Sequence, residues 1–153
     1  MTNSGEPNEG LVTVTGTGPG SFVQRIRAGA HELTADEPQP TGTDTGASPY
    51  DLLLAALGSC TSMTLQMYAD RKKWPLEKVS VSLRHDRIHA TDCANCETEA
   101  GMVSQITRVI RLEGPLDEEQ RTRLLQIADR CPVHRTLSGE IDIQTEMDAA
   151  KPH

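Results

Sequence analysis

The most chemically reactive side chains of this sequence are its four cysteines: Cys60, Cys93, Cys96 and Cys131. A cysteine thiolate is both a nucleophile and a soft metal ligand. The opening residues, MTNSGEPNEG, contain neither a basic residue nor a hydrophobic segment, so we expect no secretory signal and a cytoplasmic protein. Because cytoplasmic thiols are normally kept reduced, four cysteines favour catalysis or metal binding over structural disulfides.

Cys131 directly precedes Pro132, at the predicted start of a short helix. The backbone N–H groups and the helix dipole at such a position favour a thiolate, and Arg130 and His134 add positive charge nearby. His134 lies one turn into this helix, where it could hydrogen-bond a thiolate or face the solvent. A reactive and a structural role for Cys131 are both open on these grounds.

Cys60 lies in the middle of a predicted helix that runs from Tyr50 to about Lys72. Ser48 is a favourable N-cap, and Pro49 occupies the first helical position, where proline is tolerated. Apolar residues occupy several faces, so we expect the helix to be buried almost all round. The main apolar stripe is Leu53, Ala56, Leu57, Cys60, Thr64 and Met67. In such a helix, a small packing residue is the simplest interpretation of Cys60.

His85, His89, Cys93 and Cys96 form a second group, with the spacing H-x3-H-x3-C-x2-C. Two thiols with two imidazoles have the composition of a tetrahedral zinc site. If one strand continues through His89, however, the two histidines lie about 13 Å apart and cannot share an ion. A zinc site, a second dithiol that exchanges with Cys60 and Cys131, and a plain surface loop all remain open.

The predicted elements around these cysteines give an α+β fold. Strands are expected at residues 11–15, 22–27 and 31–35, followed by a Pro- and Gly-rich loop at 36–47 and then the long helix. Two further strands are expected at 79–83 and 102–113, the second with Met102, Ile106, Ile110 and Leu112 on one face. Asp117 and Gln120 predict a capping box at the start of another helix. Residues 141–145 alternate and predict a last strand.

Length and charge limit the class of protein. We expect one domain over residues 11–147 of the 153, with flexible tails at 1–10 and 148–153. The formal net charge of −7 argues against a nucleic-acid partner, which would be bound through Lys and Arg. The longest apolar run, residues 52–57, is far shorter than the ~20 residues of a membrane span, so we expect no membrane partner.

The core is short of bulky rings, since Phe22, Tyr50, Tyr68 and Trp74 are the only aromatic residues. A helix that is apolar on several faces is difficult for one such chain to cover. We therefore expect a homodimer whose monomer is not independently stable.

Two motifs resemble those of the OsmC family, which includes the organic hydroperoxide resistance proteins. The run from Ser48 to Cys60, SPYDLLLAALGSC, resembles the motif before its reactive cysteine, and the run from Ala128 to His134, ADRCPVH, resembles its second-cysteine motif. The resemblance covers roughly residues 11–146. It implies an intertwined homodimer of OsmC-like fold, with N-terminal antiparallel strands, a long buried central helix, a second sheet and a second cysteine-bearing helix.

The resemblance also implies a chemistry. Cys60 would attack the O–O bond of an organic hydroperoxide, Cys131 would resolve the sulfenic acid as a disulfide, and a small dithiol or thiol protein would restore both. No cofactor is required, although zinc could bind at the Cys93/Cys96 loop. Because a disulfide requires Cα atoms within ~7 Å, we expect the break at Cys131 to pack near Gly58. The alternative is an OsmC-fold dimer that mainly binds a metal or a small apolar ligand.

This chain departs from the family pattern at two positions. The family places an arginine in the turn of the N-terminal hairpin, whereas residues 16–20 here are GTGPG. Arg25 and Arg27 come later and are candidate substitutes. The family glutamate after the helix-opening proline is Tyr50 here, and Asp51 follows it. Because one residue rotates a helical side chain by about 100°, Asp51 is not an equivalent replacement.

Overall fold

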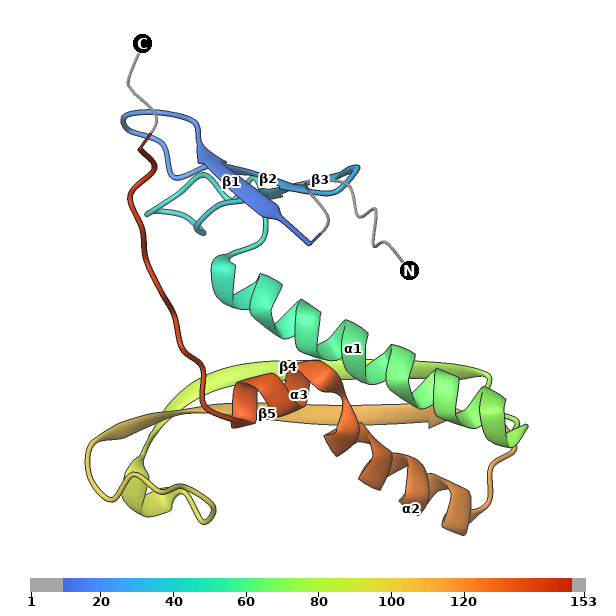
Figure 1. The fold of residues 1–153 in the computed structure, drawn as a ribbon. Coiled ribbons are helices and arrows are strands. Elements are labelled where there is room, and N and C mark those ends of the chain that lie inside the picture. The colour runs from blue at the N-terminus through green and yellow to red at the C-terminus, as the bar shows by residue number, and fades with distance from the viewer. Residues whose placement is uncertain (1–9, 150–153) are drawn as a thin grey trace. The chain divides into compact units, whose positions relative to one another are not determined.

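The computed structural model describes residues 10–149 and groups the chain into two compact units that meet between Ala55 and Ala56 (Figure 1). The sequence predicted one domain over 11–147, and the long helix runs through the boundary between the two units. The predicted tails, 1–10 and 148–153, lie mostly outside the described residues.

The first unit contains a three-stranded antiparallel sheet in the order β1-β2-β3. The strands are β1 (Val12–Gly16), β2 (Gln24–Ala28) and β3 (His31–Ala35). Ile26 in the central strand pairs with Val14 on one side and with Leu33 on the other. The three predicted strands are confirmed, with shifts of up to two residues at their ends.

A buried aspartate organises the loop that follows β3. Asp36 is only 2% exposed, and its carboxylate accepts five hydrogen bonds. The donors are the backbone N–H of Glu37 (2.8 Å) and both the N–H and the hydroxyl of Thr43 (3.1 and 2.6 Å) and Thr45 (3.1 and 2.9 Å). The sequence predicted a loop here but gave no sign that one carboxylate holds it together.

The long helix α1 (Pro49–Lys72) begins as expected. The backbone N–H of Ser48 donates to the Asp51 carboxylate (3.3 Å), and the Asp51 N–H donates to the Ser48 hydroxyl (3.2 Å). This reciprocal pair satisfies two backbone donors at the helix start. Asp51, a candidate auxiliary to the thiols in the sequence, therefore serves the helix cap.

The expectation that α1 is buried almost all round is wrong for the single chain. Its buried residues are Leu57, Gly58, Thr61, Leu65 and Ala69. Of the predicted stripe only Leu57 is buried, whereas Met67 at its end is 63% exposed. Because apolar residues occupy several faces of this helix, periodicity alone did not identify the face that packs.

By length and composition, α1 is also long and apolar enough to cross a bilayer, with a mean hydropathy of 1.2 over 18 residues. The longest uninterrupted apolar run, residues 52–57, understates the apolar length of this helix. This measure is weak evidence for a membrane span, because core helices of globular proteins meet it too.

The second unit is built on a long antiparallel hairpin of β4 (Lys78–His89) and β5 (Met102–Glu113). The two strands pair over their full length, from Lys78↔Glu113 to His89↔Met102, and the short helix η1 (Ala90–Asp92) opens their connection. Figure 1 shows α1 running alongside this hairpin. The core between helices and hairpin contains Leu65, Ala69, Leu76, Leu116, Leu124, Ile127 and Ala128.

Three short helical segments complete this unit: α2 (Glu118–Ile127), η2 (Ala128–Arg130) and α3 (Pro132–Ser138). Asp117 and Gln120 form the predicted capping box of α2. The predicted last strand at 141–145 is wrong, because these residues pair with no strand among the described residues. Ile143 is 83% exposed there, so the alternating pattern has no surface to pack on within the chain.

The Asp36 carboxylate generates a prediction about acid stability. The hydrogen bond from the Thr43 hydroxyl, supported by those from Thr45 and Glu37, lowers the pKa of Asp36 despite the opposing effect of burial. A carboxylate with a lowered folded-state pKa stabilises the fold above its unfolded pKa of about 4, and this contribution is lost as the pH falls further. Asp36→Asn should therefore lower the denaturation midpoint at pH 7 and lower it less at pH 3.

Asp44→Asn is the matched control for Asp36→Asn. Asp44 lies in the same loop, is exposed and has a φ of 56°, a conformation that asparagine also tolerates. Its midpoint should stay near that of the wild type at both pH values. Equal losses for Asp36→Asn at pH 7 and pH 3 would contradict the electrostatic account.

Candidate functional site

The two free cysteines among the described residues, Cys60 and Cys131, lie side by side. Cys60 projects from the middle of α1 and is half-buried, whereas Cys131 stands between η2 and α3 and is 0% exposed. The Cys60 side chain hydrogen-bonds the Cys131 thiol. Two thiols in contact, one of them accessible, can form a disulfide or share a proton.

The break before Pro132 positions Cys131. A residue before proline is held in an extended conformation, and Cys131 has φ −53° and ψ 128°. Pro132 then opens α3 as predicted. This conformation points the thiol at the first free N–H groups of α3, and the backbone N–H groups of Val133 and His134 both donate to it.

These donors decide the charge of the buried thiol. Burial raises the pKa of Cys131, but the hydrogen bonds from Cys60, from the N–H groups of His134 and Val133 and from the Thr61 side chain together lower it below the ordinary thiol value. Because two interacting thiols titrate as a pair, the first proton to leave belongs to both. The resulting thiolate has Cys60 as one of its donors.

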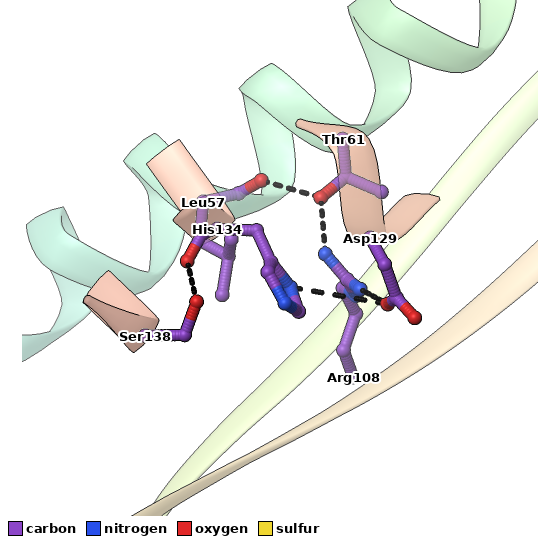
Figure 2. A network of polar contacts seen from close by, with 6 residues as sticks. All are labelled: Leu57, Thr61, Arg108, Asp129, His134 and Ser138. Atoms are coloured by element: carbon purple, nitrogen blue, oxygen red, sulfur yellow. Dashed lines mark hydrogen bonds and ion pairs between the residues drawn. The ribbon is translucent and has the colours of Figure 1, made fainter. Parts of the chain in front are cut away.

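Next to this pair, a polar network joins α1 and η2 to β5 (Figure 2). Arg108 donates through Nη1 to the Thr61 hydroxyl (2.9 Å) and through Nη2 to the Asp129 carboxylate (3.1 Å). Thr61 in turn donates to the backbone oxygen of Leu57 (2.7 Å). Arg108 was not among the site residues predicted from the sequence, although a signal existed: a charged residue lies between Ile106 and Ile110 on the apolar face of β5.

His134 contributes mainly through its backbone. Its N–H donates to the Cys131 thiol, while its imidazole Nδ1 lies 3.9 Å from the Asp129 carboxylate. The Ser138 hydroxyl donates to the His134 carbonyl (2.7 Å) and steadies α3. The imidazole is thus directed to the neighbouring carboxylate.

The other candidate auxiliaries belong to the first unit. Arg25 is exposed in β2, and Arg27 makes an exposed ion pair with Glu32 (3.2 Å). Tyr50 lies in the first turn of α1 with a 57% exposed side chain. All three residues belong to the first unit, and within that unit the Arg27 guanidinium is already paired with a carboxylate.

The Cys93/Cys96 loop forms a disulfide rather than a ligand cluster. Cys93 and Cys96 are bonded to each other, with their Cα atoms 5.5 Å apart. His85 and His89 both belong to the continuous strand β4, so they stand about 13 Å apart. No group of three or more candidate metal ligands gathers in residues 10–149. The pairing fits the second-dithiol interpretation, and zinc binding stays a prediction without geometric support.

Gly58 makes a different close approach from the one expected. A Cβ at this position would lie 2.8 Å from Cδ1 of Leu83 and 4.0 Å from Cβ of Val81. The glycine therefore lets α1 approach strand β4. The break at Cys131 packs against the middle of α1, as expected, but beside Cys60 and Thr61, about half a turn beyond Gly58. The role expected for Gly58, to admit Cys131, is wrong.

Comparisons with known proteins agree on one family. The family model of the OsmC-like protein matches residues 42–146. No curated protein sequence matches the chain. Among solved structures, an OsmC-like protein from Mycoplasma pneumoniae is similar with a TM-score of 0.65 and 22% identity, over 84% of this chain and 86% of that chain.

Two organic hydroperoxide resistance proteins are similar in fold as well. The protein from Legionella pneumophila has a TM-score of 0.60 and 19% identity, over 86% of this chain and 90% of that chain. The protein from Elizabethkingia anophelis has a TM-score of 0.61 and 18% identity, over 86% and 89%. The α+β fold expected from the sequence is confirmed by these likenesses.

The hydrogen bonds to Cys131 predict an early thiol titration. In reduced Cys93→Ser/Cys96→Ser protein, absorbance near 240 nm should show the first thiolate forming below the ordinary pKa of about 8.5. Thr61→Val removes one donor while keeping the side-chain shape, so it should move this titration to higher pH. Thr64→Val, on the same helix, should leave it in place. A first thiolate that forms only above pH 8.5 would contradict the assignment.

Proposed function

Because the chain belongs to the OsmC-like protein family, we propose that it is a thiol-dependent peroxidase that reduces organic hydroperoxides with Cys60 and Cys131. The observation that carries this proposal is the contact between a half-buried thiol and a fully buried one whose pKa is lowered. The fold likeness to organic hydroperoxide resistance proteins supports the same reaction class.

The two cysteines have different roles in the reaction because they differ in solvent exposure. Cys60 is the attacking thiol, because a peroxide in solvent can approach a half-buried sulfur but not the fully buried Cys131. Cys131, whose pKa is lowered, accepts the proton of Cys60 once it has ionised and as attack begins. Transfer along an existing hydrogen bond between two thiols needs no movement of either side chain.

The atoms of the cycle balance without a cofactor. The Cys60 thiolate attacks the terminal peroxide oxygen, so an S–O bond forms, the O–O bond breaks, and the leaving alkoxide takes the proton held by Cys131 to become an alcohol. The Cys131 thiolate that this leaves attacks the sulfur of the Cys60 sulfenic acid, so the disulfide forms, the S–O bond breaks, and the leaving hydroxide takes a proton from the solvent to become water. A small dithiol or a thiol protein of the cytoplasm supplies the two electrons that restore both thiols.

The substrate class follows from the surface next to Cys60. Ala56, Cys60, Met63 and Met67 follow one another at steps of three and four residues and share one face of α1. Met63 and Met67 are 65% and 63% exposed in the single chain. We call these four residues the α1 strip. An apolar surface beside the attacking thiol favours organic peroxides over hydrogen peroxide.

The α1 strip also supports a homodimer. Two methionines this exposed on a core helix form an apolar surface that soluble proteins usually cover. A second copy of the chain that covers the strip would enclose Cys60 in apolar walls. Such a dimer is the partner that this function requires.

Peroxide consumption tests the proposed reaction. Reduced protein mixed with cumene hydroperoxide in stopped flow should consume about one equivalent per chain, because each chain holds one reactive pair. Cys60→Ser should abolish the fast phase. Cys131→Ser should slow the first attack, because it removes the proton acceptor of Cys60, and should stop the reaction at the sulfenic acid, which a dimedone-type probe would trap. Cys93→Ser/Cys96→Ser should react like the wild type.

Consumption that does not depend on Cys60 would contradict the proposed function. The exposed α1 strip would then favour the alternative, a dimer that binds a small apolar ligand. Equilibrium binding of an apolar fluorescent probe to wild-type and Met67→Glu protein would distinguish that case.

Dilution tests the dimer. Analytical ultracentrifugation should show a dimer at micromolar concentration, with loss of structure when it dissociates. Met67→Glu places a charge in the α1 strip and should weaken association at least tenfold, since burying an unpaired charge is strongly unfavourable. Leu125→Glu, at an exposed leucine on α2, is the matched control and should leave it unchanged. A well-folded wild-type monomer at micromolar concentration would refute the dimer.

A further inference from the structure

Arg108 is a buried cation that none of the proposed chemical steps uses. Its side chain is only 12% exposed, and it comes from the face of β5 that also carries Ile106, Ile110 and Leu112. A charged side chain on such a face is unfavourable unless it is paired and hydrogen-bonded. Leucine or methionine would fill the same space, so packing alone gives no reason for an arginine.

The partners of Arg108 lie next to the two cysteines. Thr61 directly follows Cys60 on α1, and Asp129 precedes Cys131 by two residues in η2. The guanidinium donates to the first at 2.9 Å and to the second at 3.1 Å. One rigid, planar group thus joins the two segments that carry the reactive thiols, and Figure 2 shows it between them.

We propose that Arg108 is a positioning residue of the Cys60–Cys131 pair, which holds the two thiols within bonding distance and favours the thiolate through Thr61. The inference deepens the proposed function and rests on it for the role of the pair. Its geometric part follows from the bridge itself, because a disulfide forms without backbone distortion only when the two Cα atoms stay within ~7 Å.

The Thr61 hydroxyl is the path by which Arg108 acts on the thiols. Its oxygen accepts from the guanidinium, and its single proton is available to the Leu57 carbonyl or to the Cys131 sulfur. A hydroxyl that accepts a hydrogen bond from a cation becomes a stronger donor. Arg108 therefore strengthens a donor that reaches the thiolate without touching the sulfur.

Charged and titratable groups surround the pair from every neighbouring element. Arg108 faces it from β5, Asp129 from η2 and His134 from α3, while Cys60 itself comes from α1. The Asp129 side chain is 70% exposed and that of Arg108 is 12% exposed, so water screens the negative charge of Asp129 more than the positive charge of Arg108.

The test measures the thiol pair without peroxide. In a Cys93→Ser/Cys96→Ser background, glutathione redox buffers give the equilibrium constant of the Cys60–Cys131 disulfide, and absorbance near 240 nm gives the pH at which the first thiolate forms. Arg108→Gln should move the titration to higher pH. At a pH below that titration, where a stabilised thiolate does not favour the reduced form, it should also lower the equilibrium constant of the disulfide about tenfold, the effect of one lost charge-assisted hydrogen bond. Arg108→Lys keeps the positive charge but cannot donate to both partners as the planar guanidinium does. It should therefore restore most of the wild-type titration pH but less of the wild-type equilibrium constant.

Arg111→Gln is the matched control, because Arg111 lies on the same strand and is exposed. It should leave both readouts at the wild-type values. A folded Arg108→Gln protein with a wild-type equilibrium constant and titration would overturn the proposal, as would equal effects of Arg111→Gln. If Arg108→Gln does not fold, Arg108→Lys decides: wild-type values in both readouts refute the bridge. Failure of the wild type to consume peroxide would refute the proposed function but not this inference.

Discussion

A fully buried thiol whose pKa is nevertheless lowered is the constraint around which the second unit is arranged. Cys131 is fully enclosed, and burial alone would keep it protonated and unreactive. The chain offsets this by directing four donors at one sulfur: two backbone N–H groups of α3, the Thr61 hydroxyl and the Cys60 thiol. The proline break provides the first two donors, the buried face of α1 provides the Thr61 hydroxyl, and Cys60 is its half-buried neighbour on the same helix. Arg108 then connects the α1 donors to the turn before Cys131.

The same helix presents two different faces, and both serve the pair. Leu65 and Ala69 pack in the core with α2 and the β4–β5 hairpin. This packing fixes the position of the α1 segment that carries Thr61 and Cys60 relative to β5. The α1 strip faces the other way and is left uncovered in one chain. A helix that packs one face in the core and leaves an apolar face exposed in the single chain explains why its composition resembles that of a membrane span.

The features governed by local rules could be predicted from the sequence. The caps at Ser48 and Asp117, the three N-terminal strands, the 102–113 strand and the break at Pro132 depend on neighbours within a few residues. Contacts made across the chain could not be predicted. Arg108 reaches Thr61 over 47 residues of sequence, and nothing in β5 identifies the residue it meets. The strand predicted at 141–145 is wrong for a related reason, because an alternating pattern does not show whether a neighbouring strand is available to pair with it. The two thiols were expected to meet, yet the glycine expected to admit Cys131 admits Leu83 instead.

Peptide mapping after oxidation determines whether Cys60 and Cys131 are the thiols that react. Fully reduced protein is treated with one equivalent of an organic hydroperoxide, quenched with an alkylating agent, digested without reductant and analysed by mass spectrometry. The first cross-linked peptide should join Cys60 to Cys131, and Cys93 and Cys96 should be recovered in alkylated form. A dominant Cys93–Cys96 bridge, with Cys60 and Cys131 both alkylated, would move the redox chemistry to the β4–β5 connection and leave Cys60 as a packing residue.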